Sequence, residues 1–497
     1  MLRKTNLMKL AVLFLAIAYP TMAQVSPGRR QQTQDAQAYF DKAYSFRQQG
    51  QYKEAIEAFK KGLILNPKSA YYYNELSYTY SLLKQDAEAA EAAKKALEVE
   101  PNNAYAYARL GYEYNILQKY DEAFKAYNQA VLIDPRDAIS YAGLGNLYTK
   151  LKQYDAAIKV YQKSIELQPQ NGETHFEIGY AYLEAGKNEE AIKASRQAIL
   201  YKSKDTASAY NNIGYAYQLM GQYEESASAL KQSIQLDPRY MRAYSNLGRT
   251  LFLLGRHQEA AEVLQQAISM KPDEFWPHMN LGGVYFALQR YKQAAEELKQ
   301  ATQIDSKSVN AYIGLGLAYN QSAQYEEAIE AFTQVVNLKP QEANAFNSRS
   351  YSNLYLGRGE AAAADAQKYL ELSGGRNMRD QYMYLVAYFG YRQADRDAEA
   401  GKVLEDAIAK MESKSWPYPV FLYLRRESNA KELLALATDG DKKTEAQAYI
   451  GTDLLLSGHT EEAIPYLQWV RDNGNKNFVE YALAVTQLKR LEKQPEH

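Results

Sequence analysis

Cysteine is absent from all 497 residues of this chain. Its absence excludes disulfide bonds, thiol nucleophiles and metal sites built from sulfur ligands. It also suits an oxidising compartment, where a stray thiol would be oxidised. Long apolar runs are missing as well, since no stretch reaches the ~20 apolar residues that a membrane-spanning helix needs. The stability of the fold must therefore come from side-chain packing.

An excess of charge of one sign is also missing. The chain has 58 Lys and Arg against 59 Asp and Glu, which gives a formal net charge of −1 at pH 7. There is no basic excess to attract nucleic acid or an anionic membrane. We therefore expect no nucleic-acid partner.

What the sequence does have is a fixed period. Proline recurs at intervals of 34 residues, or of close to two such intervals, at Pro67, Pro101, Pro135, Pro169, Pro238, Pro272 and Pro340. A period of this length predicts a repeat architecture, in which each unit must stack on its neighbours to bury its apolar face. Chain length is then no guide to the number of domains.

Each unit has the pattern of two short antiparallel helices. In residues 138–171, a first apolar stripe with the helical spacing i, i+3, i+4, i+7 comprises Tyr141, Leu144, Gly145 and Tyr148. After a break at Lys152, a second stripe comprises Tyr154, Ala157, Tyr161 and Ser164. The small residues of both stripes fall where the helices cross, because only a short side chain lets the backbones approach. The proline ends the second helix, since the residue before a proline is pushed out of the α region.

This pattern resembles the tetratricopeptide repeat. Another copy of the family pattern reads Tyr107, Leu110, Gly111, Tyr114, Ala123, Tyr127, Ala130 and Pro135. Ten copies in register begin at residues 36, 70, 104, 138, 172, 207, 241, 275, 309 and 343. The resemblance implies an all-α fold, a right-handed superhelical solenoid of stacked helix-turn-helix repeats.

Signatures of catalysis are missing. The sequence has no P-loop, no dinucleotide fingerprint after a strand and no G-x-S-x-G nucleophile elbow. Its five histidines are scattered and form no spaced pair that suggests a metal site. His175 and His278 stand where other copies have the first interlocking tyrosine, which predicts core packing. We expect neither catalysis nor a cofactor or metal.

The N-terminus has the pattern of a secretory signal peptide over residues 1–23. Three basic residues precede an apolar run at 10–19, and we expect cleavage after Ala23. This predicts a periplasmic or secreted protein with no integral membrane anchor once the signal is removed; an uncleaved anchor is the alternative. Residues 24–35 are polar and lack helical periodicity, which predicts a disordered lead-in.

The C-terminal part, residues 378–497, departs from the ten-copy array of residues 36–372. It has two degenerate copies, from about 381 and 444, and a final capping helix to about Leu491. Two glycines at 374 and 375 break the register, which predicts that this part is decoupled from the array. From Trp416 onward it weakly resembles the end of bacterial envelope tetratricopeptide lipoproteins that act as adaptors, although the lipid-anchoring cysteine is missing.

The family resemblance also implies a peptide-binding surface. In such arrays the first helix of each unit lines a concave groove, and unit positions 2, 5, 6, 9, 12 and 13 face it. The candidate peptide-binding residues at those positions are Tyr71, Asn74, Tyr78, Tyr105, Tyr112, Asn146, Tyr180, Asn211, Asn212, Tyr215, Arg242, Asn246, Arg249, Trp276 and Asn280. Amides pair with both donors and acceptors of an extended backbone, and tyrosine supplies broad contact area at small entropy cost.

One subset of these candidates is regular. Asn212, Asn246 and Asn280 occupy position 6 in three consecutive units. They look like the asparagine ladder of the repeat domain in O-linked N-acetylglucosamine transferase, which holds peptide backbones; the alternative is that asparagine is simply common at this position in the family. Arg242 and Arg249 could bind one carboxylate or could be solvated, and no three consecutive units supply the carboxylate clamp of chaperone-binding members.

Together these features favour an exported, non-catalytic scaffold or adaptor that binds extended segments of one or more partner proteins. The alternative is a structural helper of an envelope secretion or polysaccharide-export machine, and an enzyme is a third possibility. The sequence leaves the partner and the oligomeric state open.

Overall fold

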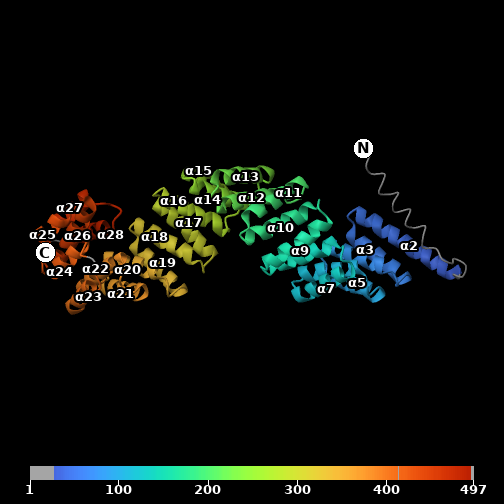
Figure 1. Ribbon diagram of the computed structural model, residues 1–497, viewed down its shortest axis with the longest axis horizontal. Helices are drawn as coiled ribbons and strands as arrows, with labels where there is room; N and C mark the ends of the chain where they lie inside the picture. The colour runs from blue at the N-terminus through green and yellow to red at the C-terminus, as the bar shows by residue number, and fades with distance from the viewer. Residues whose placement is uncertain (1–26, 412–413, 494–497) are drawn as a thin grey trace. The chain divides into compact units, whose positions relative to one another are not determined.

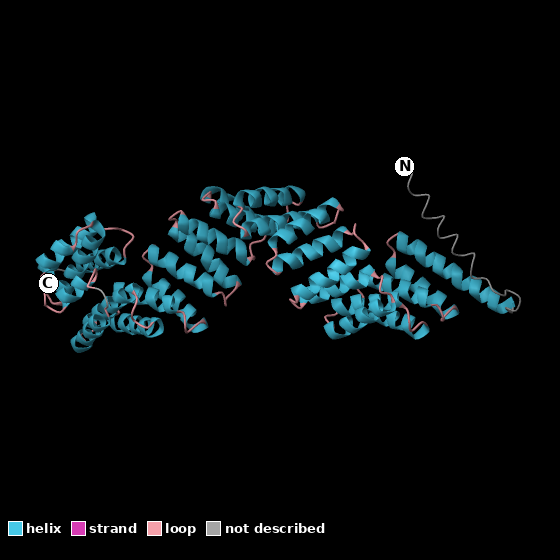
Figure 2. Ribbon diagram, in the orientation of Figure 1, coloured by secondary structure: helices cyan, strands magenta, loops and turns pink. Residues whose placement is uncertain are grey.

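The computed structural model describes residues 27–411 and 414–493, and the predicted signal peptide lies outside them. Within these ranges the secondary structure is helical, with no strand (Figures 1 and 2). The chain divides into two units, Met1–Asp237 and Pro238–His497, which we describe separately. The expected all-α helical repeat solenoid is confirmed.

The described part of unit 1 consists of six helix pairs. In chain order these are α2 (Pro27–Gln48) and α3 (Tyr52–Leu65), α4 (Ala70–Leu82) and α5 (Asp86–Val99), α6 (Ala104–Ile116) and α7 (Tyr120–Ile133), α8 (Ala138–Lys150) and α9 (Tyr154–Leu167), α10 (Gly172–Glu184) and α11 (Asn188–Leu200), and α12 (Thr206–Leu219) and α13 (Tyr223–Leu236). We call the two members of a pair its first and second helix.

Unit 2 begins with four pairs of the same kind. These are α14 (Met241–Leu253) and α15 (His257–Met270), α16 (Phe275–Ala287) and α17 (Tyr291–Ile304), α18 (Val309–Gln321) and α19 (Tyr325–Leu338), and α20 (Ala343–Tyr355) and α21 (Gly359–Ser373). The helices that follow are α22 (Met378–Gln393), α23 (Asp397–Lys410), α24 (Tyr418–Leu424), α25 (Ala430–Leu436), α26 (Gly440–Leu456), α27 (Thr460–Asn473) and α28 (Val479–Lys493).

A small residue on the first helix faces a large one on the second, as the repeat pattern predicts. Tyr161 of α9 is fully buried against Gly145 of α8. A β-carbon at Gly145 would lie 2.5 Å from Cε1 of Tyr161, which is far inside van der Waals contact. The same contact recurs one repeat earlier between Gly111 and Tyr127. The glycines therefore let the two helices approach closely enough for the rings to pack between them.

The turn between the two helices of a pair has a recurring backbone geometry. Lys152, where the sequence predicts a break, lies in the left-handed region with φ of 58°, and Gly186 and Gly255 take the same place in their own pairs with φ of 74° and 75°. Glycine adopts this conformation without the strain that a β-carbon adds. The second helix α9 ends at Leu167, two residues before Pro169, as expected from the proline.

The predicted disordered lead-in is wrong from Pro27 onward, because α2 already begins there. Proline suits the first turn of a helix, and glutamine and arginine are good helix formers. The helix is held in place further along, where Phe40 is buried against Phe59 of α3. The Gln32 side chain also donates a 3.0 Å hydrogen bond to the Leu65 carbonyl oxygen. The helical spacing of apolar residues in α2 starts only at its buried residues. The polar first turns therefore give no helical pattern in the sequence.

The C-terminal helices pack onto the tenth helix pair. One continuous hydrophobic core includes residues from α19 to α28. The Tyr355 hydroxyl of α20 donates a 3.1 Å hydrogen bond to the Val479 carbonyl oxygen of α28. The predicted decoupling at Gly374 and Gly375 is therefore wrong. Both glycines have positive φ and only redirect the chain after α21.

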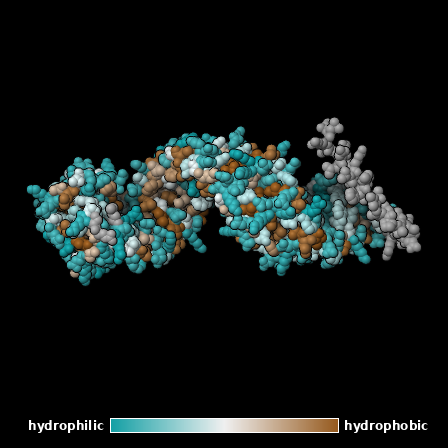
Figure 3. All heavy atoms as spheres, viewed as in Figure 1, coloured by the Kyte–Doolittle hydropathy of each residue, from teal (hydrophilic) through white to brown (hydrophobic). Residues whose placement is uncertain are grey.

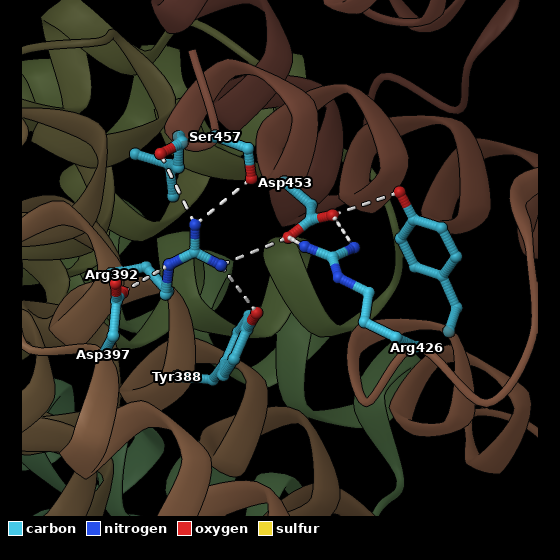
Figure 4. A network of polar contacts seen from close by, with 8 residues as sticks. Tyr388, Arg392, Asp397, Arg426, Asp453 and Ser457 are labelled. Atoms are coloured by element: carbon cyan, nitrogen blue, oxygen red, sulfur yellow. Dashed lines mark hydrogen bonds and ion pairs between the residues drawn. The ribbon is translucent and has the colours of Figure 1, made fainter. Parts of the chain in front are cut away.

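A buried carboxylate joins three segments of this C-terminal region (Figure 4). Asp453 of α26, only 1% exposed, accepts hydrogen bonds from both terminal nitrogens of Arg426 at 2.6 and 3.1 Å. It also accepts one from the Tyr423 hydroxyl at 3.1 Å, and Arg392 of α22 approaches it at 3.5 Å. These hydrogen bonds and ion pairs compensate the negative charge of Asp453, which would otherwise be costly to bury.

Apolar side chains are buried in local clusters between neighbouring helices, such as the one around Tyr161 and Ile178. In Figure 3 the face in view is mostly hydrophilic, with apolar residues in separate patches. No helix within the described ranges is both long and apolar enough to cross a membrane.

Candidate functional site

All the predicted peptide-binding residues lie on first helices, but they differ in how far their side chains are exposed to solvent. The exposed ones are Tyr71, Tyr78, Tyr105, Tyr112, Arg242, Arg249 and Trp276. The half-buried ones are Asn146, Tyr180, Tyr215, Asn246 and Asn280. The buried ones are Asn74, Asn211 and Asn212. The accessible part of the predicted surface is therefore aromatic and arginine-rich, and the amides lie deeper.

Tyrosine and arginine side chains alternate across the first three first helices of unit 1. The Arg47 guanidinium of α2 lies 5.0 Å from the ring centroid of Tyr44 and 5.3 Å from that of Tyr78 on α4. The Arg109 guanidinium of α6 lies 5.4 Å from the rings of both Tyr78 and Tyr112. These are cation–π distances. We call this series Tyr44, Arg47, Tyr78, Arg109, Tyr112 the tyrosine–arginine column.

Each arginine of the column has its own carboxyl partner. Arg47 donates to Glu75 of α4 at 2.7 Å, and Arg109 donates to Glu113 at 2.6 Å one turn along α6. Glu113 is fully buried. Burial raises the pKa of its carboxyl to about 7, and the attraction of Arg109 offsets this only in part. Each guanidinium of the column is therefore already paired with a carboxyl group.

Around the column, unit 1 exposes a group of large apolar side chains. Tyr71, Tyr105 and Ile139 are 60%, 48% and 62% exposed and share repeat position 2 on α4, α6 and α8. Tyr78 and Tyr112 are 39% and 45% exposed and share repeat position 9. We call these five residues the unit 1 face. The four tyrosines among them combine ring surface with hydroxyls that can donate hydrogen bonds.

The predicted asparagine ladder includes members of both units. In unit 1, Asn212 is 7% exposed, and its amide nitrogen has no hydrogen-bond partner among the described residues. In unit 2, the Asn280 amide of α16 lies 3.4 Å from both the carbonyl oxygen and the hydroxyl of Ser245 on α14. That amide therefore links neighbouring first helices. A role of the ladder in peptide binding stays a prediction.

Sequence models of the tetratricopeptide repeat match most of the array. The matched residues are 36–69, 70–103, 92–125, 111–152, 145–186, 172–205, 205–273, 282–323 and 309–342, which together span more than half of the chain. The chain is a tetratricopeptide repeat protein. Four of these matches begin at residues 36, 70, 172 and 309, where the sequence pattern places the start of a copy.

Several solved structures of this repeat family are similar to parts of the chain. MamA from Desulfovibrio magneticus RS-1 is 26% identical, with 34% of this chain and 94% of that chain covered and a TM-score of 0.31. YrrB, described as a TPR protein with an unusual peptide-binding site, is 26% identical, with 38% and 96% covered and a TM-score of 0.33. Pseudomonas aeruginosa PilF is 19% identical, with 44% and 96% covered and a TM-score of 0.38. No curated protein sequence matches the chain.

Sequence reasoning missed three residues of the tetratricopeptide surface. Arg47, Arg109 and Ile139 occupy repeat positions 12, 6 and 2, which the family rule assigns to the groove. The position rule alone could have found them. The cation–π contacts of both arginines with Tyr78 could not be foreseen, because each one joins residues 31 positions apart on different helices.

The two core histidines of the tetratricopeptide array have the predicted role. His175 and His278 are 9% and 5% exposed. Each places Nε2 within hydrogen-bond distance of the carbonyl oxygen of the preceding repeat's proline, Pro169 or Pro272. The Tyr244 hydroxyl donates to Pro238 in the same way. Histidine therefore substitutes for tyrosine in an inter-repeat contact.

Proposed function

We propose that this protein is an exported, non-catalytic scaffold or adaptor that binds extended segments of partner proteins on its first helices. Membership of the tetratricopeptide repeat family supports a role in protein interaction. The signal-peptide pattern of residues 1–23 favours a partner in the cell envelope.

The observation that carries the proposal is the unit 1 face. Soluble proteins rarely expose several large apolar side chains together unless the surface binds something. Here the five residues lie at two repeat positions on three consecutive first helices. Tyrosine is also a residue type enriched at protein interfaces, because it buries a large ring and still satisfies a polar group.

Affinity capture tests this proposal. We expect the mature protein to retain a discrete set of envelope proteins, and the Tyr71→Ser/Tyr105→Ser variant to lose them. Leu132→Ser/Leu200→Ser is the matched control, because these leucines are 71% and 64% exposed on second helices. If both variants retain the same proteins as the unmodified chain, the binding surface lies elsewhere. A retained set made of export-machine components would favour the structural helper.

The export part of the proposal has its own test. Residues 1–23 have a basic start, an apolar run and a small-residue end, which favour cleavage after Ala23. Intact-mass measurement of the protein from its native source should give a chain that begins at Gln24. An intact Met1 would contradict cleavage and with it the periplasmic or secreted location.

A further inference from the structure

We propose that helix α28 is a pH-sensitive cover over helix α20, which loosens when two buried carboxyl groups, those of Glu445 and Glu480, ionise. The proposal goes beyond the proposed function, because it concerns only the C-terminal region of unit 2. It holds whatever partner the unit 1 face binds.

Helix α28 covers a residue whose counterparts in other repeats are exposed. Tyr355 of α20 holds repeat position 13, where Leu82 of α4 and Ile116 of α6 are 37% and 41% exposed. Tyr355 is only 4% exposed. Its hydroxyl donates a hydrogen bond to the Val479 carbonyl oxygen at the start of α28. The burial of this tyrosine therefore depends on the position of α28.

A second residue of α20 is covered in the same way. Tyr351 holds repeat position 9, where Tyr78 and Tyr112 are exposed in unit 1. Tyr351 is half-buried, and it lines a small cavity together with Glu480 and Leu483 of α28. Helix α28 thus lies over the side of α20 that α4 and α6 leave exposed.

The two carboxyl groups connect α28, α26 and α22. Glu480 of α28 is buried and accepts a 2.5 Å hydrogen bond from the Tyr449 hydroxyl of α26. Glu445 of α26 is also buried, and it accepts hydrogen bonds from the Tyr382 hydroxyl of α22 at 3.3 Å and from Nε1 of Trp416 at 2.7 Å. The contact between these helices is therefore built around carboxyl groups.

No cation compensates these carboxyl groups. In the described part of the chain, neither Glu445 nor Glu480 forms an ion pair with Lys, Arg or His. The titratable groups that face them are an acid or neutral hydroxyls, namely Asp441 and Tyr449 of α26, Tyr382 of α22, and Tyr351 and Tyr355 of α20. Burial raises the pKa of all four tyrosines, so their hydroxyls stay protonated. A buried carboxylate without a cation is costly, so the contact favours the protonated form of both acids.

The direction of the pH effect follows from this. Burial and then the nearby Glu480 raise the pKa of Glu445 from 4.5 to about 7, and the hydrogen bonds from Trp416 and Tyr382 offset this only in part. Burial also raises the pKa of Glu480. Protonation of Glu445 therefore stabilises the contact in full below pH 4.5, and this contribution is lost as the pH rises to about 7. Above that pH, movement of α28 away from α20 would return the carboxylates to water.

Hydrogen exchange tests the inference. Protection factors, which correct for the intrinsic effect of pH on exchange, would be measured at about pH 5.5 and pH 8.5. We expect protection of α28 to fall at least about tenfold between the two, while α14 of the same unit keeps its protection. Equal protection of α28 at both pH values would overturn the inference. An equal loss in α14 would do so as well, because it would indicate unfolding of the whole unit.

Variants assign the effect to the two carboxyl groups. Glu445→Gln/Glu480→Gln should keep α28 equally protected at both pH values, because neither amide ionises. Glu461→Gln/Glu492→Gln is the matched control, since these carboxylates are exposed on α27 and α28, and it should lose protection as the unmodified chain does. A loss of protection in the first variant as large as in the control would overturn the inference.

Trp416 provides a measurement that leaves both carboxyl groups in place. The chain has three tryptophans, so Trp276→Phe/Trp469→Phe leaves only Trp416, which donates to Glu445. Its fluorescence should change with a midpoint near pH 7, the pKa to which Glu445 is raised. A flat titration would contradict the ionisation of Glu445, and a titration without loss of protection in α28 would contradict the cover. None of these outcomes involves the unit 1 face, so the proposed function is tested separately.

Discussion

Arg109 and Glu113 are one helical turn apart on α6 and share a hydrogen bond of 2.6 Å between Nη2 and Oε1. Glu113 is fully buried, and its second oxygen has no partner among the described residues. The pair therefore fixes the arginine that separates two rings of the tyrosine–arginine column. It also makes the position of Arg109 in the column dependent on a single buried acid.

Removal of Arg109 should destabilise unit 1. Arg109→Met leaves the Glu113 carboxyl buried without a cation, and we expect the free energy of unfolding to fall by about 3 kcal/mol. Adding Glu113→Gln to this variant should restore part of the loss, because an amide is cheaper to bury than a carboxylate. Chemical denaturation followed by circular dichroism measures both. Strictly additive effects of the two changes would contradict the coupling.

The raised pKa of Glu113 predicts a specific pH dependence. The folded protein holds this proton more tightly than the unfolded chain, with the pKa raised from 4.5 to about 7. Protonation of Glu113 therefore adds to the free energy of unfolding in full below pH 4.5, and this contribution is lost as the pH rises to about 7. Melting temperatures across this window should fall less steeply for Glu113→Gln than for the unmodified chain. Parallel profiles would show that Glu113 ionises normally in the fold.

The glycines of the first helices should differ in their tolerance of a β-carbon. In Gly145→Ala the new methyl would lie 2.5 Å from the Tyr161 ring, and we expect destabilisation of about 1–3 kcal/mol by overpacking. Gly283→Ala is the control, because no atom lies within 4 Å of a β-carbon there. This second change should stabilise helix α16 by about 0.5–1 kcal/mol. Thermal unfolding distinguishes the two, and equal effects would count against the predicted helix crossing.

The C-terminal region should respond as one block. Asp453→Asn removes the negative charge that holds Arg426 and Arg392, so we expect faster amide hydrogen exchange in α22, α24 and α26 together. Helices α4, α6 and α8 of unit 1 serve as the internal reference and should be unchanged. A change confined to the short helices α24 and α25 would argue against the continuous core.

The sequence predicted the helix pairs well because their signals are local. The glycine and tyrosine of a pair, such as Gly145 and Tyr161, lie within one 34-residue period, and proline marks its end. The first turns of α2 and the docking of the tail could not be predicted in this way. The start of α2 is polar, and Tyr355 meets Val479 across more than 120 residues.

The candidate surface was predicted only in part. Repeat position indicates which helix face a residue occupies, but not how deeply it lies. Asn280 is half-buried where α16 contacts α14, and Asn212 is buried. Tyrosines at one repeat position also differ in exposure, since Tyr78 and Tyr112 are exposed and Tyr180 is half-buried. The contacts of the column's arginines with Tyr78 become recognisable only when the side chains of adjacent repeats are placed beside one another.

Site-specific photo-crosslinking is the most direct test of the central claim, which is that a partner protein contacts the unit 1 face. A photoreactive benzoylphenylalanine would replace Tyr105 on α6 in the chain expressed in its native host. The control places the same residue at Leu132 on α7, which is more exposed. The account predicts a discrete protein adduct from position 105 and none from position 132. Adducts from position 132 alone would contradict it.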